Sequence, residues 1–586
     1  MELSGIGVGR GIAVGAVLRM PDPLPEPEPG RHSGDAAAEY AAVKVALAEV
    51  AAELQDRAER AGGESQAVLE AASMMASDPS LDEDVRARIE SGTTGERAVF
   101  EAFAAFQTIL IGMGGYLAER AADLGDVSQR IIARLRGVPA PGVPTSDTPF
   151  VLVAHDLAPA DTALLDLNRV LALITRDGGP TSHTAILARA KSIPAIVGVS
   201  GALDLVDGDV VVADAASGTI TVNPTPEIIA AARERIAQHE VTAHAPITRG
   251  ALADGTLIPL LANLGSPTEA PAAVALGAEG VGLFRTEFLF LGATRAPTVA
   301  EQQAQYVELL KHFSGQKVVV RALDAGADKP LTFLTNSHEE NPALGLRGLR
   351  ALRASEQILR DQLSALANAQ AETDADLWVM APMVADAAET DYFVAIGREL
   401  GLKTVGVMAE VPSLALVAEQ VAQVADFVSV GTNDLTQYTL AADRMLGSVA
   451  SYQDPWHPAV LRLIKMIGDA GATFGIPVGI CGEAAADPQL AVVLVGLGAT
   501  SLSMTPAALA DVRAELLTVT LGQAKSRAAL ALLARTAVEA RAVAMATETV
   551  LDPDPEPEPD ADAEPDADAE TETEVELESP VEAERT

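Results

Sequence analysis

A histidine near residue 180 lies in a segment that could carry phosphate chemistry. The apolar run Leu171–Ile174 predicts a buried strand, and Gly178-Gly179-Pro180 then breaks the chain. Ser182 is a good N-cap for the next helix, so His183 falls in its first turn, beside unpaired backbone N–H groups and the positive end of the dipole. An imidazole there stays neutral and nucleophilic near pH 7, and a phosphate attached to it would be stabilised. The alternative is a histidine that only caps or packs.

A second group of polar residues lies in the C-terminal half, at or near the ends of predicted strands. Its members are Asn263, Arg285, Arg321, Glu410, Asn433, Asp434, Cys481 and Ser503. Arginines on neighbouring strands can hold a phosphate and a carboxylate through paired hydrogen bonds. Two of the acids offer the hard oxygen ligands that Mg²⁺ prefers. Phosphoryl transfer depends mainly on positioning and charge stabilisation, so these residue types suit it.

Two members of this group and one further residue, Arg444, extend the same chemistry. Asn433 can donate hydrogen bonds to phosphate oxygens, and Arg444 adds positive charge. Cys481 is expected to be buried near a bound anion, which would keep its thiol protonated and able to give a proton to a carbanion. For any one of these residues alone, an ordinary salt bridge or a buried thiol is the simpler interpretation. Their joint position at strand ends favours a single site.

The strands that must position this second group follow a regular pattern. They are predicted at Pro259–Ala262, Val281–Phe284, Val318–Leu323, Val379–Met383, Val405–Met408, Phe427–Val430, Val478–Cys481 and Ser501–Met504. Helices are predicted between them, over 267–276, 300–314, 344–369, 386–400, 412–423 and 457–472. Eight β/α units over residues 251–548 predict a (β/α)8 barrel, whose active sites lie at the C-terminal ends of the strands.

The first half of the chain predicts a different arrangement. Residues 1–20 and 145–223 read as short strands with few helices, one of them near 158–166, and predict a small α/β domain that contains His183. Residues 30–144 form a helical insert, with helices over 36–62, 65–76, 95–122 and 124–136. Leu69, Met74 and Met75 are either core residues of this insert or an apolar docking patch. Residues 224–250, with a helix over 226–238, predict a linker.

Charge and composition narrow the class of protein. The chain has 586 residues, 48% of them hydrophobic, and a net charge of −41, which argues against a nucleic-acid backbone or an anionic membrane as partner. Residues 552–586 hold 16 acidic residues and one arginine, so residues 1–551 still carry −26. The acidic segment 549–586 is predicted to be disordered. A single cysteine excludes an internal disulfide and suits a cytoplasmic location. Met1 starts no basic-then-apolar leader and no apolar run reaches 18 residues, so neither a signal peptide nor a membrane span is expected.

Residues 178–189, Gly-Gly-Pro-Thr-Ser-His-Thr-Ala-Ile-Leu-Ala-Arg, resemble the phosphohistidine signature of one superfamily. Enzyme I of the phosphoenolpyruvate:sugar phosphotransferase system, pyruvate phosphate dikinase and phosphoenolpyruvate synthase share it. The resemblance implies that His183 carries the phosphate on a swivelling α/β domain. Such a domain needs a linker, because donor and acceptor cannot occupy the same face of one imidazole together.

The barrel sequence resembles enzyme I as well. The motifs that carry the resemblance lie at 280–290, 321–329, 341–347, 408–412, 431–438, 443–444 and 479–483. Together with the histidine loop, the likeness covers roughly residues 1–540. It departs from the family at Phe284, Ala327 and Val411, where Tyr, Gly and Thr are expected, and none of these changes removes a reacting group.

The resemblance to enzyme I implies roles for particular residues. Phosphoenolpyruvate would be bound by Arg285, Arg321, Asn433, Asp434 and Arg444. Glu410 and Asp434 would hold Mg²⁺, and Cys481 would protonate enolpyruvate to pyruvate. His183 would pass its phosphate to a histidine of the carrier protein HPr, gripped by the helical insert, in the first step of sugar uptake. The barrel would form a homodimer.

Two other functions share parts of this pattern. A dikinase or phosphoenolpyruvate synthase has the same histidine loop and barrel, but it also needs an ATP-binding domain. The 144 residues that precede the main part of the α/β domain are mostly helical and lack a Gly-rich phosphate loop. A catalytically idle homologue that only binds partners is the second alternative, and the intact reactive set argues against it. The carrier could belong to a sugar-uptake branch or to a regulatory nitrogen branch.

Overall fold

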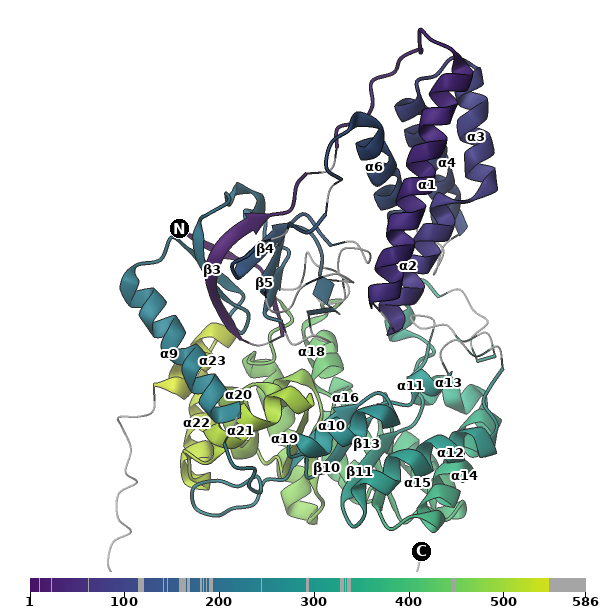
Figure 1. Ribbon diagram of the computed structural model, residues 1–586. Coiled ribbons are helices and arrows are strands. Elements are labelled where there is room, and N and C mark those ends of the chain that lie inside the picture. Colours follow the sequence, from purple (N-terminus) through teal and green to yellow (C-terminus); the bar gives the residue numbers. More distant parts are fainter. Residues whose placement is uncertain are drawn as a thin grey trace, which may run out of the picture. The chain divides into compact units, whose positions relative to one another are not determined.

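The computed structural model of the chain (Figure 1) describes most of residues 1–546. The positions it leaves out are 10, 23, 62, 114–120, 141, 145, 158–164, 166–168, 180–181, 183, 186, 189–192, 244, 291–292, 294, 327–330, 332, 335–338, 445, 447–448, 450–451 and 547–586. Three predictions therefore lie outside the described residues: the placement of His183, the helix near 158–166, and the disordered tail.

An eight-stranded mixed sheet forms the α/β part of the chain. Its order is β1-β8-β7-β3-β4-β5-β6-β2, with β3, β4, β5 and β6 parallel to one another. The strands are β1 (Glu2–Ser4), β2 (Ile6–Val8), β3 (Ile12–Arg19), β4 (Phe150–Ala154), β5 (Val170–Thr175), β6 (Ala195–Val197), β7 (Val210–Asp214) and β8 (Thr219–Val222). All of β4 is buried, with Val151 and Val153 in the core on one face and Leu152 and Ala154 in the core on the other. Burial on both faces explains the unbroken apolar sequences of the central strands.

Among the described residues between β3 and β4, five helices share one apolar core. They are α1 (Ala36–Ala61), α2 (Gly63–Ala76), α3 (Pro79–Glu90), α4 (Gly95–Met113) and α6 (Ala121–Arg136). Leu69 belongs to the core, Met75 packs against it, and Met74 is 68% exposed. Leu69 and Met75 are thus core residues, and only Met74 is available to a partner.

Helix α3 is absent from the sequence prediction, although its start is well marked. The side chain of Asp78 accepts hydrogen bonds from the backbone N–H groups of Ser80 and Leu81, and Pro79 occupies the first turn. Only Leu81, Val85 and Ile89 are buried, in a helix that is otherwise mostly charged or small. A stripe of three residues four apart is a weak periodic signal.

The helix that follows β8, α9 (Pro226–Ala243), is longer than the predicted 226–238. It contacts β3, and Arg235 Nη1 lies 2.9 Å from Asp214 Oδ2 of β7. Part of the segment predicted as a linker is therefore a helix with contacts to the sheet.

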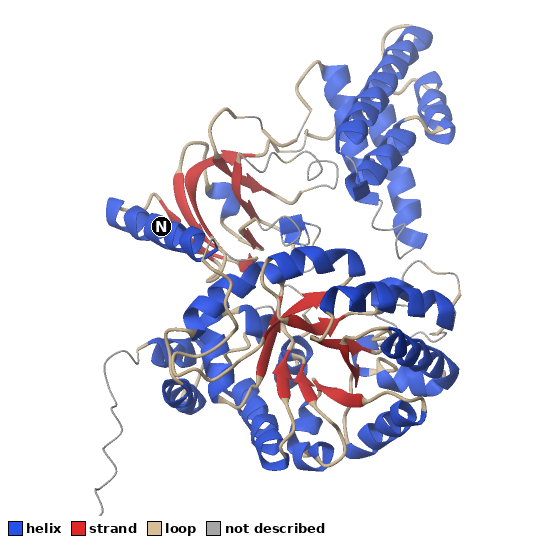
Figure 2. Cartoon of the chain, turned by 60° about the horizontal axis from the view of Figure 1, so that its bottom comes forward, coloured by secondary structure: helices blue, strands red, loops and turns tan. Residues whose placement is uncertain are grey.

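The C-terminal half is a closed barrel of eight parallel strands, which confirms the predicted fold class (Figure 2). Its strands are β9 (Leu260–Leu264), β10 (Gly280–Phe284), β11 (Lys317–Arg321), β12 (Asp376–Ala381), β13 (Thr404–Ala409), β14 (Val428–Val430), β15 (Val478–Ile480) and β16 (Ser501–Met504). β16 closes the ring by pairing with β9. Each strand overlaps its predicted segment.

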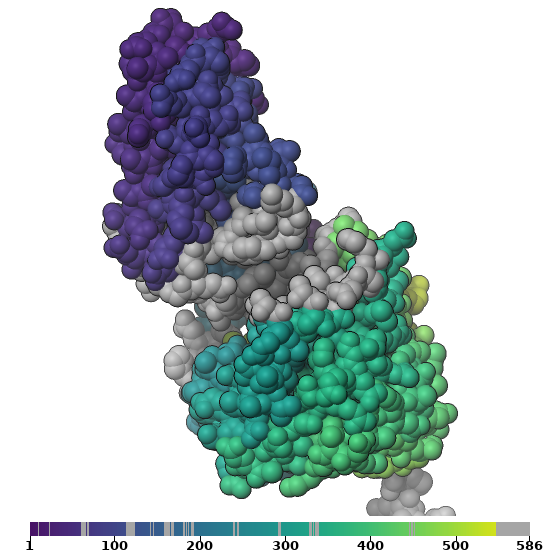
Figure 3. All heavy atoms as spheres, turned by 90° about the vertical axis from the view of Figure 1, so that its right-hand side faces the viewer, coloured from purple at the N-terminus to yellow at the C-terminus, as the bar shows by residue number. Residues whose placement is uncertain are grey.

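Helices surround the barrel strands (Figure 2), and the face of this half seen in Figure 3 is a continuous surface of packed atoms. The helices are α10 (Ala270–Ala275), α11 (Glu287–Phe290), α12 (Val299–Leu310), α13 (Leu349–Ala354), α14 (Glu356–Glu372), α15 (Ala387–Glu399), α16 (Pro412–Leu416), α17 (Ala418–Ala422), α18 (Thr432–Leu440), α19 (Pro458–Phe474), α20 (Pro488–Gly496), α21 (Leu509–Leu516), α22 (Leu521–Leu533) and α23 (Ala537–Met545). The single helices predicted over 344–369 and 412–423 are each two helices, which divide at Ser355 and Val417.

Side chains fill the middle of the barrel. The interior cluster consists of Leu283, Val319, Met380, Met408, Phe427 and Cys481. On β11, Val318 and Val320 face the surrounding helices while Val319 faces inward, as the two-residue period of a strand requires. Lys317 and Arg321 share the inward face with Val319, at opposite ends of the strand.

Replacing Gly406 with alanine should destabilise the barrel. A Cβ at this β13 position would lie 2.5 and 2.6 Å from ring carbons of Phe427 and closer still to its carbonyl oxygen. Overpacking of this kind costs about 1–3 kcal/mol of unfolding free energy. Gly522→Ala, in helix α22, is the matched control, because a Cβ there would lie 3.9 Å from the nearest atom, Thr520 Oγ1. It should stabilise the chain by about 0.4–1 kcal/mol. Urea unfolding followed by circular dichroism measures both, and equal stabilities for the two variants would contradict the packing argument.

Candidate functional site

The barrel brings the predicted polar residues to the C-terminal ends of its strands. Asn263 lies in β9, Arg285 follows β10, Arg321 ends β11, Glu410 follows β13, Asn433 and Asp434 begin α18 after β14, Cys481 follows β15, and Ser503 lies in β16. Strands from all around the barrel thus contribute to one end of it. Arg444 lies in the segment after α18.

Arg321 is a buried cation held by two carboxylates. Its Nη2 donates to Glu287 Oε1 at 2.6 Å, and its Nη1 lies 3.2 Å from Asp324 Oδ2. Burial alone would lower the pKa of Arg321, but the charges of Glu287 and Asp324 outweigh it and leave the pKa above its ordinary value. Within the described residues its Nε has no hydrogen-bond partner, although it is buried. Such a donor is costly unless an acceptor reaches it.

Arg347 connects this cluster to the opposite side of the barrel end. It donates from Nε and Nη2 to the two carboxylate oxygens of Asp324, at 3.1 and 3.0 Å. Its Nη1 donates to Asp434 Oδ1 at 2.8 Å and to the hydroxyl of Tyr438 at 3.0 Å. One guanidinium therefore fixes the segment after β11 relative to α18.

Asp434 lies between two arginines. Besides Arg347, the Nη1 of half-buried Arg444 is 3.6 Å from Asp434 Oδ2. The neighbouring Asn433 accepts a hydrogen bond from the backbone N–H of Glu483 at 3.1 Å, which leaves its amide nitrogen available. This part of the site therefore carries both positive charge and a neutral donor.

Glu410 is 1% exposed and accepts a hydrogen bond from the backbone N–H of Met383 at 2.7 Å. Met383 has a φ of 56°, a strained value for a residue with a side chain. Such a conformation persists only where the surrounding structure holds it, so the segment after β12 is fixed in the position that makes this contact. Burial raises the pKa of Glu410, and the charges of Asp434 and Asp324 raise it further. Gly431 gives the carboxylate room, since a Cβ there would lie 2.7 Å from Glu410 Oε2.

Two neighbouring carboxylates that repel each other form a set that a divalent cation would stabilise. Glu410 and Asp434 supply the oxygen ligands that suit Mg²⁺, which is commonly held by one or two carboxylates, water and substrate oxygens. Among the described residues, no group of three or more His, Cys, Asp or Glu side chains is arranged to hold a metal ion. The residues present thus fit a metal that shares its coordination with a ligand.

Cys481 is 2% exposed, and its thiol donates to the carbonyl oxygen of Val430 at 3.4 Å. Burial raises the pKa of this thiol to about 11, despite a hydrogen bond with Ser429 that acts in the opposite direction. The thiol is therefore protonated at neutral pH, as the sequence predicted.

Arg285 and Asn263 differ in how their side chains are used. Arg285 is exposed, and no hydrogen bond or ion pair to its guanidinium is seen in the described part of the chain. Asn263 donates to the carbonyl oxygen of Cys481 at 3.0 Å and accepts from the hydroxyl of Ser503. Asn263 and Ser503 thus link β9, β15 and β16, whereas Arg285 is free to meet a ligand.

Around the predicted phosphohistidine, the flanking residues are described although His183 is not. Ser182 Oγ accepts a hydrogen bond from the backbone N–H of Ala185 at 3.3 Å, the contact expected of an N-cap. Thr184 Oγ1 donates to Asp156 Oδ1 at 2.7 Å, which ties the loop to the end of β4. Gly178 has a φ of 96°, a conformation that favours glycine at this turn.

Sequence reasoning assigned no role to Glu287, Asp324 and Arg347, although all three lie in motifs that pointed to the barrel. Each is buried, at 6%, 2% and 3% exposure. Glu287 and Asp324 each follow an apolar strand by three residues, and that position is a signal for the end of the barrel. Arg347 lies in the connection before α13, where its position in the sequence carries no such signal.

Removing the carboxylate of Asp324 should strongly destabilise the barrel, because Arg321 and Arg347 would lose a buried counter-charge. Breaking a buried ion pair from one side costs about 3–5 kcal/mol. Asp324→Ala should therefore lower the urea-unfolding free energy by about that amount. Asp469→Ala is the control: Asp469 and its partner Lys465 both lie on the exposed face of α19, and such surface pairs contribute about 0–1 kcal/mol. A loss of less than 1 kcal/mol for Asp324→Ala would contradict the network.

The single cysteine makes its own ionisation measurable. A pKa of about 11 against an ordinary value of 9.0 gives a thiolate fraction roughly 100-fold lower at pH 8 in the folded chain. Because folding favours the protonated thiol, ionisation destabilises the folded chain above about pH 9. Iodoacetamide should thus label Cys481 at least about 100-fold more slowly in the native protein than in urea, and the native rate should still be rising above pH 9. Native labelling within about tenfold of the unfolded rate would contradict the shift.

Family comparisons agree with this geometry. Residues 4–120 match the PEP-utilising enzyme, N-terminal family, residues 147–218 the PEP-utilising enzyme, mobile domain, and residues 239–521 the PEP-utilising enzyme, PEP-binding domain. Within the described residues, no helix has the length and apolar character needed to cross a membrane.

Curated relatives match nearly the whole chain. The phosphoenolpyruvate-protein phosphotransferase of Streptomyces coelicolor is 52% identical over 541 residues, which are 92% of this chain and 97% of that protein. The enzyme of the same name from Geobacillus stearothermophilus is 37% identical, over 88% of this chain and 92% of its own. That from Haloferax volcanii is 40% identical, over 82% and 87%. The chain therefore belongs to the phosphoenolpyruvate-protein phosphotransferase family.

Proposed function

We propose that the chain transfers the phosphoryl group of phosphoenolpyruvate to its own His183 and then to a histidine of the carrier protein HPr, releasing pyruvate. The observation that carries this proposal is the cationic set at the C-terminal end of the barrel. Arg321 there has a buried, unpartnered Nε, and the exposed Arg285 has no side-chain partner in the described part of the chain. Both donors suit the phosphate and carboxylate of a small trianion.

Substrate binding would use the donors of several strands. Arg285 and Arg321 lie on neighbouring strands β10 and β11, as a clamp on two anionic groups requires. The amide nitrogen of Asn433 and the guanidinium of Arg444 would meet the phosphate from the side of α18. Asp434 would contribute to substrate binding as one of the two residues that hold the metal ion.

Glu410 and Asp434 would hold Mg²⁺, which when bound neutralises charge on the phosphate. The raised pKa of Glu410 supports this assignment, because the carboxylate sits among other acids without enough positive charge beside it. Met383 and Gly431 keep the Glu410 carboxylate in one position.

The reaction would form one bond and break one bond at phosphorus. The neutral imidazole of His183 attacks the phosphorus, the P–N bond forms, and the bond to the enol oxygen breaks. The enolate of pyruvate then takes a proton at carbon from the Cys481 thiol, and solvent restores that proton. A protonated thiol in the barrel interior, with a pKa of about 11, supports the role of proton donor.

The remaining parts of the proposal concern partners. The helical insert, with α1, α2, α3, α4 and α6, would grip HPr, to which His183 passes its phosphate in the first step of sugar uptake. The barrel would form a homodimer, and the chain would act in the cytoplasm. Met74 is 68% exposed on the helical insert, and this exposure supports an apolar contact with the carrier.

Phosphoenolpyruvate labelled in its phosphate should label the wild-type chain and leave His183→Ala unlabelled, because only the imidazole offers the nucleophile. The label should be acid-labile and base-stable and should require Mg²⁺. His155→Ala, a substitution of another histidine of the α/β part, is the matched control and should keep wild-type labelling. Labelled HPr with pyruvate release then tests the second step.

The same labelling experiment is repeated with labelled ATP as the donor, and two outcomes would reject the proposal. Label from ATP and not from phosphoenolpyruvate would assign the chain to a dikinase-type reaction. Label from neither donor in a folded preparation would leave a binding role without catalysis.

A further inference from the structure

The N-terminal mouth of the barrel contains a hollow of about 500 Å³, at the end opposite Arg321 and Asp434. It is bounded by the starts of several strands and by the C-terminal end of α19. Its lining includes Pro259, Lys317, Trp378, Ala472, Pro477 and Ser501. A volume of this size is in the range of small-molecule sites, which are mostly apolar with a few polar groups.

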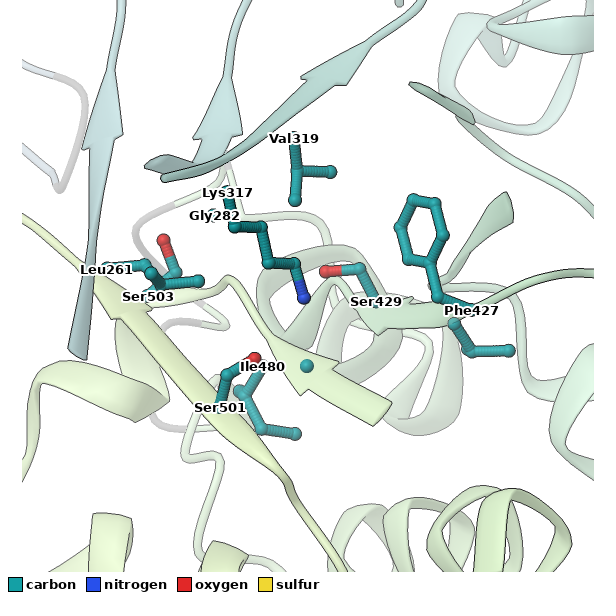
Figure 4. A pocket seen from close by; sticks show the side chains of 11 residues that line it. Leu261, Gly282, Lys317, Val319, Phe427, Ser429, Ile480, Ser501 and Ser503 are labelled. Atoms are coloured by element: carbon teal, nitrogen blue, oxygen red, sulfur yellow. The ribbon is translucent and has the colours of Figure 1, made fainter. Parts of the chain in front are cut away.

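Lys317 is the one charged residue in this lining. It begins β11, and its side chain enters the barrel toward Ser429 and Ser501, where a second space of about 10 Å³ has room for roughly one water molecule (Figure 4). Its Nζ lies 3.6 Å from the ring centre of Trp378 and 5.9 Å from that of Phe427. The ammonium group therefore rests on aromatic faces at the point where the two spaces meet.

No hydrogen bond or ion pair to Lys317 Nζ is seen within the described residues. Burial lowers the pKa of Lys317 to about 8, and the charge of Asp376, an exposed residue at the start of β12, only partly offsets this effect. An ammonium group without a full counter-charge in such a place is costly. An anion in the hollow would supply that charge.

The interior cluster separates this hollow from the opposite end of the barrel. Leu283, Val319, Met380 and Met408 form a packed layer between Lys317 and the charged residues around Arg321. A ligand in the hollow would thus bind independently of one held by Arg321.

We propose that the hollow at the N-terminal mouth of the barrel binds a small aromatic monocarboxylate. One cation selects a single negative charge, and the hydroxyl of Ser501 offers a second contact to the carboxylate. Trp378, Pro259 and Pro477 provide flat apolar surfaces for a ring. Trp378 is only half-buried, so a bound ring would cover the part of the indole that water now reaches.

Benzoate is the probe, and the fluorescence of Trp378 is the readout. The chain has two tryptophans, and the other, Trp456, is fully buried against the outer helices. The difference between wild type and Trp378→Phe therefore isolates the signal of the hollow. Benzoate should give a saturable change in wild type, and saturating phosphoenolpyruvate should not displace it.

Lys317→Met should weaken benzoate binding about 10- to 100-fold, because a charge-assisted contact is lost. Lys403→Met, the same substitution at an exposed lysine just before β13, should leave binding unchanged. Ala472→Phe fills the hollow from α19 without altering Lys317 and should also weaken binding at least about tenfold. Benzyl alcohol, which keeps the ring and lacks the charge, should bind at least about tenfold more weakly than benzoate.

Several results would overturn the proposal. They are a wild-type titration without saturation, wild-type affinity in both Lys317→Met and Ala472→Phe, displacement of benzoate by phosphoenolpyruvate, and inorganic phosphate binding as tightly as benzoate. Circular dichroism of each variant shows whether it is folded, and Ala472→Phe serves as the test if Lys317→Met is not.

Discussion

The C-terminal end of the barrel depends on one buried chain of charges, Arg321–Asp324–Arg347–Asp434. Each of its ions would be expensive to bury alone, because the loss of hydration costs several kcal/mol per ion. Together they alternate in sign and are joined by hydrogen bonds of 2.8–3.1 Å between Arg347 and its two acids and by the Arg321–Asp324 ion pair. The chain spans from β11 to α18, so it fixes parts of the barrel that are more than 100 residues apart in sequence.

This chain of charges also sets the electrostatics available to a ligand. Within the described part of the site, the acids include Glu287, Asp324, Glu410 and Asp434, and the arginines include Arg285, Arg321, Arg347 and Arg444. All three nitrogens of Arg347 donate hydrogen bonds, to Asp324, Asp434 and Tyr438. Arg321 keeps one buried donor without a partner in the described residues, and Arg285 remains exposed. The site is therefore rigid where charges pair and open where they do not. That combination is what electrostatic preorganisation requires, since little reorganisation remains when an anion arrives.

Much of this arrangement could be predicted because the barrel imposes a strict register. Once eight apolar strands are recognised, a polar residue at the end of each must lie at the same end of the barrel. The common location of the polar residues followed from that logic, and the protonated state of Cys481 followed from its expected burial near an anion. The structural uses of Asn263, Glu287, Asp324 and Arg347 did not, because whether a polar side chain faces a ligand or another side chain depends on distances that only the fold sets. Helix α3 was missed for a related reason: its few buried residues gain their meaning from packing against the core of the insert.

The register of the barrel also places two cations of β11 at opposite ends of its interior. Lys317 and Arg321 are four residues apart and face the same interior, so they lie about 13 Å apart along the strand, at opposite ends of the barrel. Arg321 has two carboxylates within 3.2 Å. Lys317 has aromatic rings and one exposed acid nearby, and its pKa falls to about 8 while that of Arg321 rises above its ordinary value. One strand thus carries a compensated cation at one end and an undercompensated cation at the other. A folded protein tolerates the second only at a cost in stability, and the hollow beside Lys317 is where an anion would remove that cost.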